Sequence, residues 1–109
     1  MRKRLNEHEI MTALSHLEHW KRTEDGRWIE RRYHFKTFLQ AIEFVQKIAG
    51  IVEEKMHHPL IQIDYKVVTL KLSSWQAGGL TALDMEEAHT FDAVYNRMDT
   101  PSNERDEME

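Results

Sequence analysis

The sequence predicts a single α+β domain in which a four-stranded antiparallel sheet carries three helices on one face, in the order α-β-β-α-β-β-α. Two observations predict this fold class. Apolar residues recur at helical spacing in three segments, and two further regions alternate apolar and polar residues as half-buried strands do. The strands within each region are joined by very short connections, which impose antiparallel pairing.

Capping and turn residues mark the first helix and the first hairpin. Asn6 with Glu9 has the spacing of a capping box, and the apolar residues after it predict a helix over about residues 7 to 18. The dipeptide Asp25-Gly26 then favours a tight turn between two strand-like segments. We therefore expect a hairpin to follow the first helix.

The second helix has the clearest pattern in the chain. Thr37 and Gln40 repeat the capping spacing, and a continuous apolar stripe follows at i, i+3, i+4 and i+7. This stripe predicts a helix that runs to roughly Met56. Its members are Phe38, Ala41, Ile42, Val45, Ile48, Ala49 and Val52.

Two strands and a third helix are predicted after Pro59. Alternating apolar residues between positions 61 and 73 indicate two short strands that turn near residues 64–66. A pair of glycines ends this region, and Thr81 with Asp84 marks the start of the third helix, because a carboxylate there can accept amide hydrogen bonds.

Composition and charge limit the classes of function. The 109 residues hold 40% hydrophobic and 31% charged residues and no Cys, which suits one globular domain over 1–98 without disulfides or thiolate chemistry. We find no secretory signal and no membrane-spanning run, so we expect a cytoplasmic protein that does not bind membranes. The acidic segment 99–109 lacks apolar periodicity and is predicted to be a disordered tail. That segment accounts for the net charge of −4, and the neutral remainder argues against nucleic-acid binding.

The adjacent histidines His57 and His58 are the strongest indication of chemistry. They stand between a predicted helix and a predicted strand, and Pro59 biases His58 away from helical conformation. Imidazoles accept and release protons near neutral pH. The residues alone leave an alternative open, since histidines at a helix end can simply cap it and interact favourably with its dipole.

A wider set of spaced residues resembles the pterin-4a-carbinolamine dehydratase family. The resemblance covers roughly residues 5 to 98 without large gaps, on the element order that this family has. The residues that carry it are Trp20, the segment 35–38, Ala41, Glu53, His57, His58, Pro59, Tyr65, Trp75, the segment Gly78-Gly79-Leu80-Thr81, and Asp84.

The resemblance implies a hydro-lyase that removes water from 4a-hydroxytetrahydrobiopterin-type pterins and gives a quinonoid dihydropterin, in tetrahydropterin recycling. It also implies a homodimer or homotetramer with neither a metal nor an organic cofactor. By this resemblance His57 and His58 are the catalytic residues. The residues implied to bind the substrate are Glu53, His57, His58, Ser73, Ser74, Trp75, Gln76 and Asp84.

Trp75 stands where many members of this family have a third histidine. An indole cannot transfer protons, but it can stack on a flat pterin. The alternative function is therefore a non-catalytic pterin-binding or protein-dimerisation module on the same scaffold. A purely structural role also stays open for two acids, since Glu53 could lie on a solvated helix face and Asp84 could serve only to start a helix. The other histidines show no metal-binding spacing.

Overall fold

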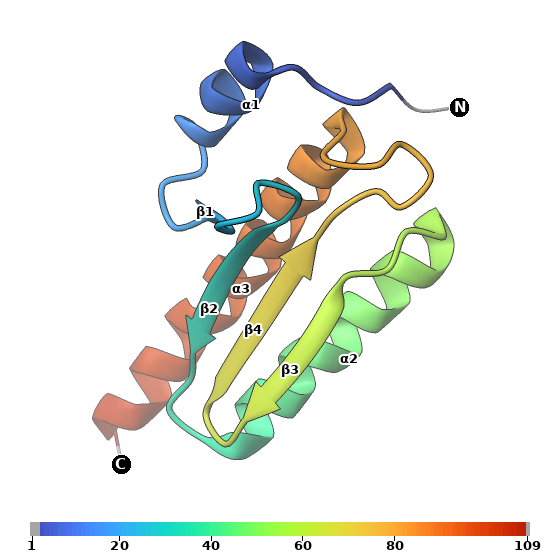
Figure 1. Ribbon diagram of the computed structural model, residues 1–109. Coiled ribbons are helices and arrows are strands. Elements are labelled where there is room, and N and C mark those ends of the chain that lie inside the picture. The colour runs from blue at the N-terminus through green and yellow to red at the C-terminus, as the bar shows by residue number, and fades with distance from the viewer. Residues whose placement is uncertain (1–2, 109) are drawn as a thin grey trace.

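A computed structural model describes residues 3–108 of the chain, with side chains described as far as residue 98. Its element order confirms the predicted α+β fold (Figure 1). The elements are α1 (Glu7–Leu14), β1 (Lys21–Arg22), β2 (Ile29–His34), α2 (Phe38–Lys55), β3 (Leu60–Asp64), β4 (Val67–Leu72) and α3 (Ala82–Met108).

The two hairpins join through their inner strands. The strand order is β1-β2-β4-β3, and every neighbouring pair is antiparallel. The central pair β2 and β4 is in register over six residues, with Ile29 opposite Leu72 and Tyr33 opposite Val68. The sheet therefore ends in β1 on one side and in β3 on the other.

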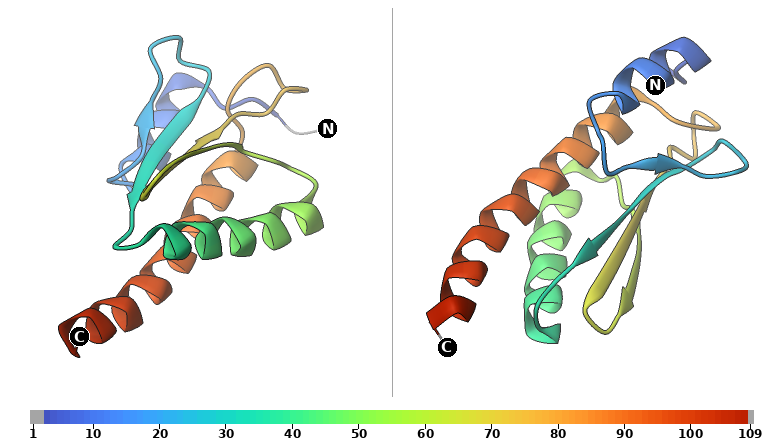
Figure 2. Two further views of the ribbon diagram at one scale, coloured as in Figure 1. Left: turned by 90° about the horizontal axis from the view of Figure 1, so that it is seen from below. Right: turned by 90° about the vertical axis from the view of Figure 1, so that its left-hand side faces the viewer.

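Helices α2 and α3 pack on one face of this sheet (Figure 2). Alternate side chains of β2 and β4 point toward them, because successive residues of a strand face opposite sides. The core joins these strand residues to the apolar stripes of α2 and α3. Its fully buried members include Ile29, Tyr33, Ala41, Phe44, Ile48, Val68, Leu70, Leu72, Ala88 and Phe91. None of the described helices is long and apolar enough to cross a membrane.

The first helix is shorter than the sequence predicts. Asn6 and Glu9 form the expected capping box, but α1 ends at Leu14 instead of continuing to residue 18. Beyond it the backbone tightens, since the amide of Leu17 donates to the carbonyl of Leu14. Leu17 is nevertheless buried, so its apolar spacing reports burial and not helical conformation.

The third helix is longer than its apolar stripe indicates. Its backbone continues through residues 99–108, where the sequence predicts a disordered tail. The side chains of 99–109 lie outside those described. The division into a domain over 1–98 and a separate tail therefore stays a prediction.

Candidate active site

The end of α2 places the two histidines. The helix is capped by Met56 in the left-handed conformation, with φ of 53°, and β3 begins just after Pro59. The left-handed residue ends the helix, and Pro59 disfavours helical conformation at His58, the residue before it. The intervening His57 and His58 therefore lie on a short turn between two packed elements.

His57 is held by a buried carboxylate. Its Nε2 lies 2.7 Å from Oδ1 of Asp84, which is fully buried in the first turn of α3. Because a carboxylate only accepts hydrogen bonds, Nε2 of His57 is the donor in this pair. In the neutral ring Nδ1 is then the basic nitrogen, and protonation makes it a donor.

The second carboxylate oxygen of Asp84, Oδ2, accepts hydrogen bonds from three donors. The hydroxyl of Ser74 donates at 2.8 Å, the amide of Thr81 at 2.9 Å and the hydroxyl of Thr81 at 3.3 Å. These contacts confirm that Asp84 accepts an amide bond at the start of α3. They also fix the carboxylate, and through it the orientation of His57.

His58 has a carboxylate partner of a different kind. Its Nε2 lies 2.6 Å from Oε2 of Glu53, five residues earlier in the last turn of α2, and both side chains are exposed to solvent. Solvent weakens such a contact relative to a buried one. His58 is therefore oriented less rigidly than His57.

A cleft of about 430 Å³ opens beside the two histidines. Trp75 stands at its rim with 86% of its surface exposed. The loop that carries Trp75 is closed by backbone hydrogen bonds between Ser74 and Gly79, and Gly78 adopts a φ of 77° that favours glycine. The lining residues are Lys55, Met56, His57, His58, Ser73, Ser74, Trp75, Gln76, Ala77 and Leu83.

The cleft brings together most of the residues predicted for the site. The two histidines and the segment 73–76 all line it. Glu53 and Asp84 do not line it, and each instead binds one imidazole. Ser73 lines the cleft, although its hydroxyl donates to the carbonyl of Arg27.

Glu87 is a buried acid that the sequence analysis missed. It lies one turn after Asp84 on α3, is fully buried, and neither carboxyl oxygen has a hydrogen-bond partner among the described residues. Burial raises the pKa of Glu87 to about 7; the nearby charge of Asp84 raises it further, whereas His57, Lys55 and His58 lower it. The sequence did contain a signal for this burial, because Glu87 lies on the same face of the predicted helix as the apolar residues Ala88 and Phe91.

A second polar cluster, also missed, lies between the sheet and α3. Asp92 accepts hydrogen bonds from Trp20 Nε1 at 3.0 Å, Arg31 Nη1 at 2.7 Å and the hydroxyl of Tyr33 at 2.6 Å. Arg31 also stacks over the rings of Tyr33 and Tyr95. Burial, reinforced by the charge of Asp92, raises the pKa of Tyr33 well above its ordinary value. The phenol therefore keeps its proton and donates it to Asp92.

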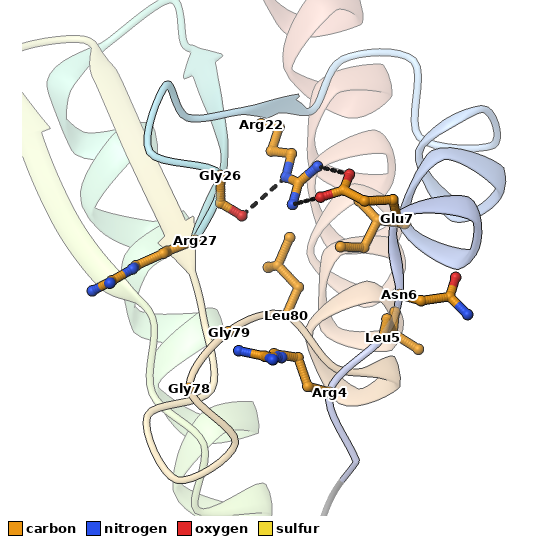
Figure 3. A pocket seen from close by; sticks show the side chains of 11 residues that line it. Arg4, Leu5, Asn6, Glu7, Arg22, Gly26, Arg27, Gly78, Gly79 and Leu80 are labelled. Atoms are coloured by element: carbon orange, nitrogen blue, oxygen red, sulfur yellow. Dashed lines mark hydrogen bonds and ion pairs between the residues drawn. The ribbon is translucent and has the colours of Figure 1, made fainter.

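A separate cleft of about 440 Å³ lies where the N-terminal segment crosses the loop that contains Gly78 and Gly79 (Figure 3). Arg22 is bound there to Glu7 and to the carbonyl of Gly26, while Arg4 lies across Gly79. A Cβ on Gly79 would stand 2.9 Å from Cδ of Arg4, so this close approach favours glycine. Of these two clefts, only the one beside Trp75 is lined by imidazoles. The loop from Ser74 to Gly79 lies between the two clefts.

The described residues contain no group of three His, Asp or Glu side chains arranged to hold a metal ion. His57 and His58 instead bind separate carboxylates, Asp84 and Glu53. Two imidazoles, each with its own acid, form an arrangement suited to taking up and releasing protons.

Comparison with known proteins points to one family. The sequence profile of the pterin 4 alpha carbinolamine dehydratase family matches residues 3–94. A protein of Koribacter versatilis that carries the provisional name pterin-4-alpha-carbinolamine dehydratase is 43% identical over 87% of this chain and 99% of its own. A protein of a Picosynechococcus species with the same provisional name is 42% identical over 86% of this chain and all of its own.

Two solved structures share the fold. A transcriptional coactivator/pterin dehydratase from Brucella melitensis superposes with a TM-score of 0.81 at 33% identity, over 85% of this chain and 99% of that one. A pterin dehydratase-like protein described as a RuBisCO assembly factor of the alpha-carboxysome has a TM-score of 0.61 at 22% identity, over 70% of this chain and 88% of that one, and this likeness concerns the fold alone. The profile match and the close relatives together show that the chain belongs to the pterin 4 alpha carbinolamine dehydratase family.

Proposed function

We propose that this protein removes water from 4a-hydroxytetrahydropterins by acid-base catalysis with His57 and His58. The observation that carries the proposal is that both imidazoles line one cleft, and that each is bound to a carboxylate. Family membership supports the reaction class. The proposal places the reaction in the cytoplasm, in the recycling of tetrahydropterins.

The reaction asks for two proton transfers. The bond from C4a to its hydroxyl oxygen breaks as a proton reaches that oxygen, and water leaves. The N5–H proton is removed, and its electron pair forms the C4a–N5 double bond of the quinonoid product. An imidazolium supplies the first proton and a neutral imidazole accepts the second, since both forms coexist near neutral pH.

The two imidazoles have different surroundings for these tasks. Asp84 holds His57 through Nε2, which leaves Nδ1 to exchange protons with the substrate. His58 lies at the solvent-exposed side, where Glu53 orients its ring. In this proposal the two residues share the transfers between them.

The segment 73–76 of the cleft lining is proposed to hold the pterin. Trp75 offers a flat and exposed indole on which a bicyclic ring can stack. Ser73, Ser74 and Gln76 supply neighbouring polar groups along the same wall. Asp84 and Glu53 contribute to binding by fixing the histidines that face the ligand.

Dehydration by purified protein tests the proposal. The substrate is generated in situ, and its loss is followed for the parent and for His57→Ala and His58→Ala. We expect each substitution to lower the rate by about 10²-fold or more, because each removes a proton-transferring group. His16→Ala, on an exposed residue after α1, is the matched control and should retain the parent rate.

If the parent protein dehydrated the substrate no faster than protein-free buffer, the proposed enzymatic activity would be refuted. Equal rates for the parent and both site variants would refute the assignment to His57 and His58. Circular dichroism of each variant separates such results from loss of the fold.

A non-catalytic module is the second candidate, and Trp75 is the observation that favours it. An indole at this position removes one proton-transferring ring relative to many family members. A structural neighbour with this fold is described as a RuBisCO assembly factor, and this description supports a non-catalytic candidate. Pterin binding by the parent without turnover would support this candidate over the enzyme.

We also propose that the protein is a homodimer or homotetramer. The outer strand β3 is exposed along its whole length and carries Leu60, Ile61 and Ile63 with between 37% and 48% of their surface exposed. An apolar edge strand with free backbone groups favours pairing with a second copy.

A further inference from the structure

A small hollow of about 100 Å³ adjoins the candidate active-site cleft. The two share part of their lining, because Ser73, Ser74 and Trp75 belong to both. The hollow is completed by Gly78 and Gly79 and by two residues that precede β2, Arg27 and Trp28. It therefore extends the cleft from Trp75 to the connection between β1 and β2.

The backbone of Arg27 is fixed beside the segment that carries Trp75. Its carbonyl accepts a hydrogen bond of 2.6 Å from the hydroxyl of Ser73. Its amide donates to Oδ1 of Asp25 at 3.0 Å, within the turn of the hairpin. These two bonds hold the point from which the side chain of Arg27 starts, at the edge of the hollow.

The guanidinium of Arg27 is available to a ligand. It is exposed, and none of the hydrogen bonds or ion pairs among the described residues involves it. Figure 3 shows that it points away from the pair formed by Arg22 and Glu7. The acid nearest to it in the chain, Asp25, is already bound by the hydroxyl of Thr23 and by the amide of Arg27.

Positive charge along the cleft and the hollow is not balanced by acids that line them. Among the described residues, the lining of the two includes Lys55 and Arg27 but neither Asp nor Glu. Glu53 and Asp84 lie outside this lining, and each binds an imidazole. A ligand that reaches from the cleft into the hollow therefore meets cationic groups, and complementary charge on the ligand favours its binding.

We propose that Arg27 is a substrate-binding residue, and that it selects pterins whose substituent ends in a phosphate or carboxylate group. The ring lies in the cleft against Trp75, and the substituent extends over the shared rim into the hollow. A guanidinium binds either anionic group through two parallel hydrogen bonds. The inference rests on the proposed function in one respect, which is that a pterin ring occupies the cleft.

Calorimetric titration of the full chain with three pterins tests this inference without requiring turnover. The probes are 6-hydroxymethylpterin, its phosphate ester and pteroylglutamate, so that a neutral, a phosphate and a carboxylate substituent are compared on the same ring. We expect at least one anionic probe to bind about tenfold more tightly than the neutral one. The probe that gains affinity tells which anion the hollow accepts.

Two substitutions of the exposed Arg27 assign this preference to its side chain. Arg27→Gln removes the charge and should bring the affinity for the anionic probe to that for the neutral one. Arg27→Glu reverses the charge and should make the anionic probe the weaker ligand. Arg32→Gln is the matched control, because it removes an equal charge from an exposed residue of β2 that lines neither the cleft nor the hollow, and it should keep the preference.

The inference is overturned if the parent binds all three probes equally or binds none of them. It is also overturned if folded Arg27→Gln and Arg27→Glu keep the preference of the parent. Failure of the proposed function gives a different result. A parent that dehydrates no pterin, but shows a preference that depends on Arg27, refutes the enzyme and supports the inference, whereas dehydration without any such preference refutes only the inference.

Discussion

Each of the two adjacent histidines binds its own carboxylate, and the two carboxylates differ in burial. Asp84 is fully buried and accepts three further hydrogen bonds, so it holds His57 in one orientation. Glu53 is exposed and leaves His58 open to solvent. A charge-assisted bond gains strength where water is excluded. The pair therefore combines one fixed and one adaptable imidazole.

Trp75 gives a prediction about rate and stereochemistry. Trp75→His introduces a third ring that can transfer protons, and we expect a faster reaction, by about 10-fold or more, on at least one C4a stereoisomer of the carbinolamine. The measurement compares the initial dehydration rates of both isomers for the variant and the parent. Trp75→Phe, which keeps a flat ring, is the control and should preserve the isomer preference of the parent. Equal rates and equal preference for Trp75→His and the parent would contradict the prediction.

The histidine pair and its acids were predictable from sequence, whereas Glu87 and Asp92 were not. His57, His58, Glu53 and Asp84 have fixed spacing along the chain, so a resemblance can identify them. Asp92 instead binds Trp20 across 72 residues, a contact that depends on how α3 packs on the sheet. Local pattern also cannot reveal that the carboxyl of Glu87 faces the core with no partner.

At the scale of elements, helix starts were predicted better than helix ends. The amide of Gln40 bonds to the Thr37 side chain as the capping spacing indicates, because a cap is a contact between residues three apart. The end of α1 was wrong because the apolar spacing continues to Leu17 while the backbone changes to tighter bonds. The end of α2, by contrast, was predicted correctly, because Met56 caps the helix.

The exposed strand β3 gives a prediction about assembly. Ile63→Lys places a charge on this apolar edge, and we expect it to lower the molar mass in solution from that of a homodimer or homotetramer toward the 13.1 kDa protomer. Light scattering on the eluting protein provides the mass. Met11→Lys, at a still more exposed apolar residue of α1, is the control and should keep the mass of the parent. The prediction fails if the parent is already a monomer, or if Ile63→Lys leaves the mass unchanged.

At the scale of the whole molecule, two polar clusters connect α3 to the rest of the fold. Near its start, Asp84 joins the helix to the loop of Ser74 and to His57. Two turns further on, Asp92 joins it to β2 through Arg31 and Tyr33. The helix that carries Asp84 is thus held against the sheet by hydrogen bonds as well as by its apolar stripe. Because both clusters lie on α3, the hydrogen bonds of Asp92 help to keep Asp84 in place beside His57.

The Asp92 cluster gives the prediction that concerns global stability. Arg31 has only 10% of its side chain exposed, so Asp92→Ala leaves a nearly buried guanidinium without its carboxylate. We expect a loss of about 3–5 kcal/mol in the free energy of unfolding, measured by urea titration. The double variant Arg31→Met with Asp92→Leu removes both charges and should recover much of that loss, because an apolar pair no longer buries an unpaired charge. Glu7→Ala breaks only the exposed pair with Arg22 and serves as the control. If Asp92→Ala were no less stable than Glu7→Ala, the cluster would not be what holds α3 on the sheet.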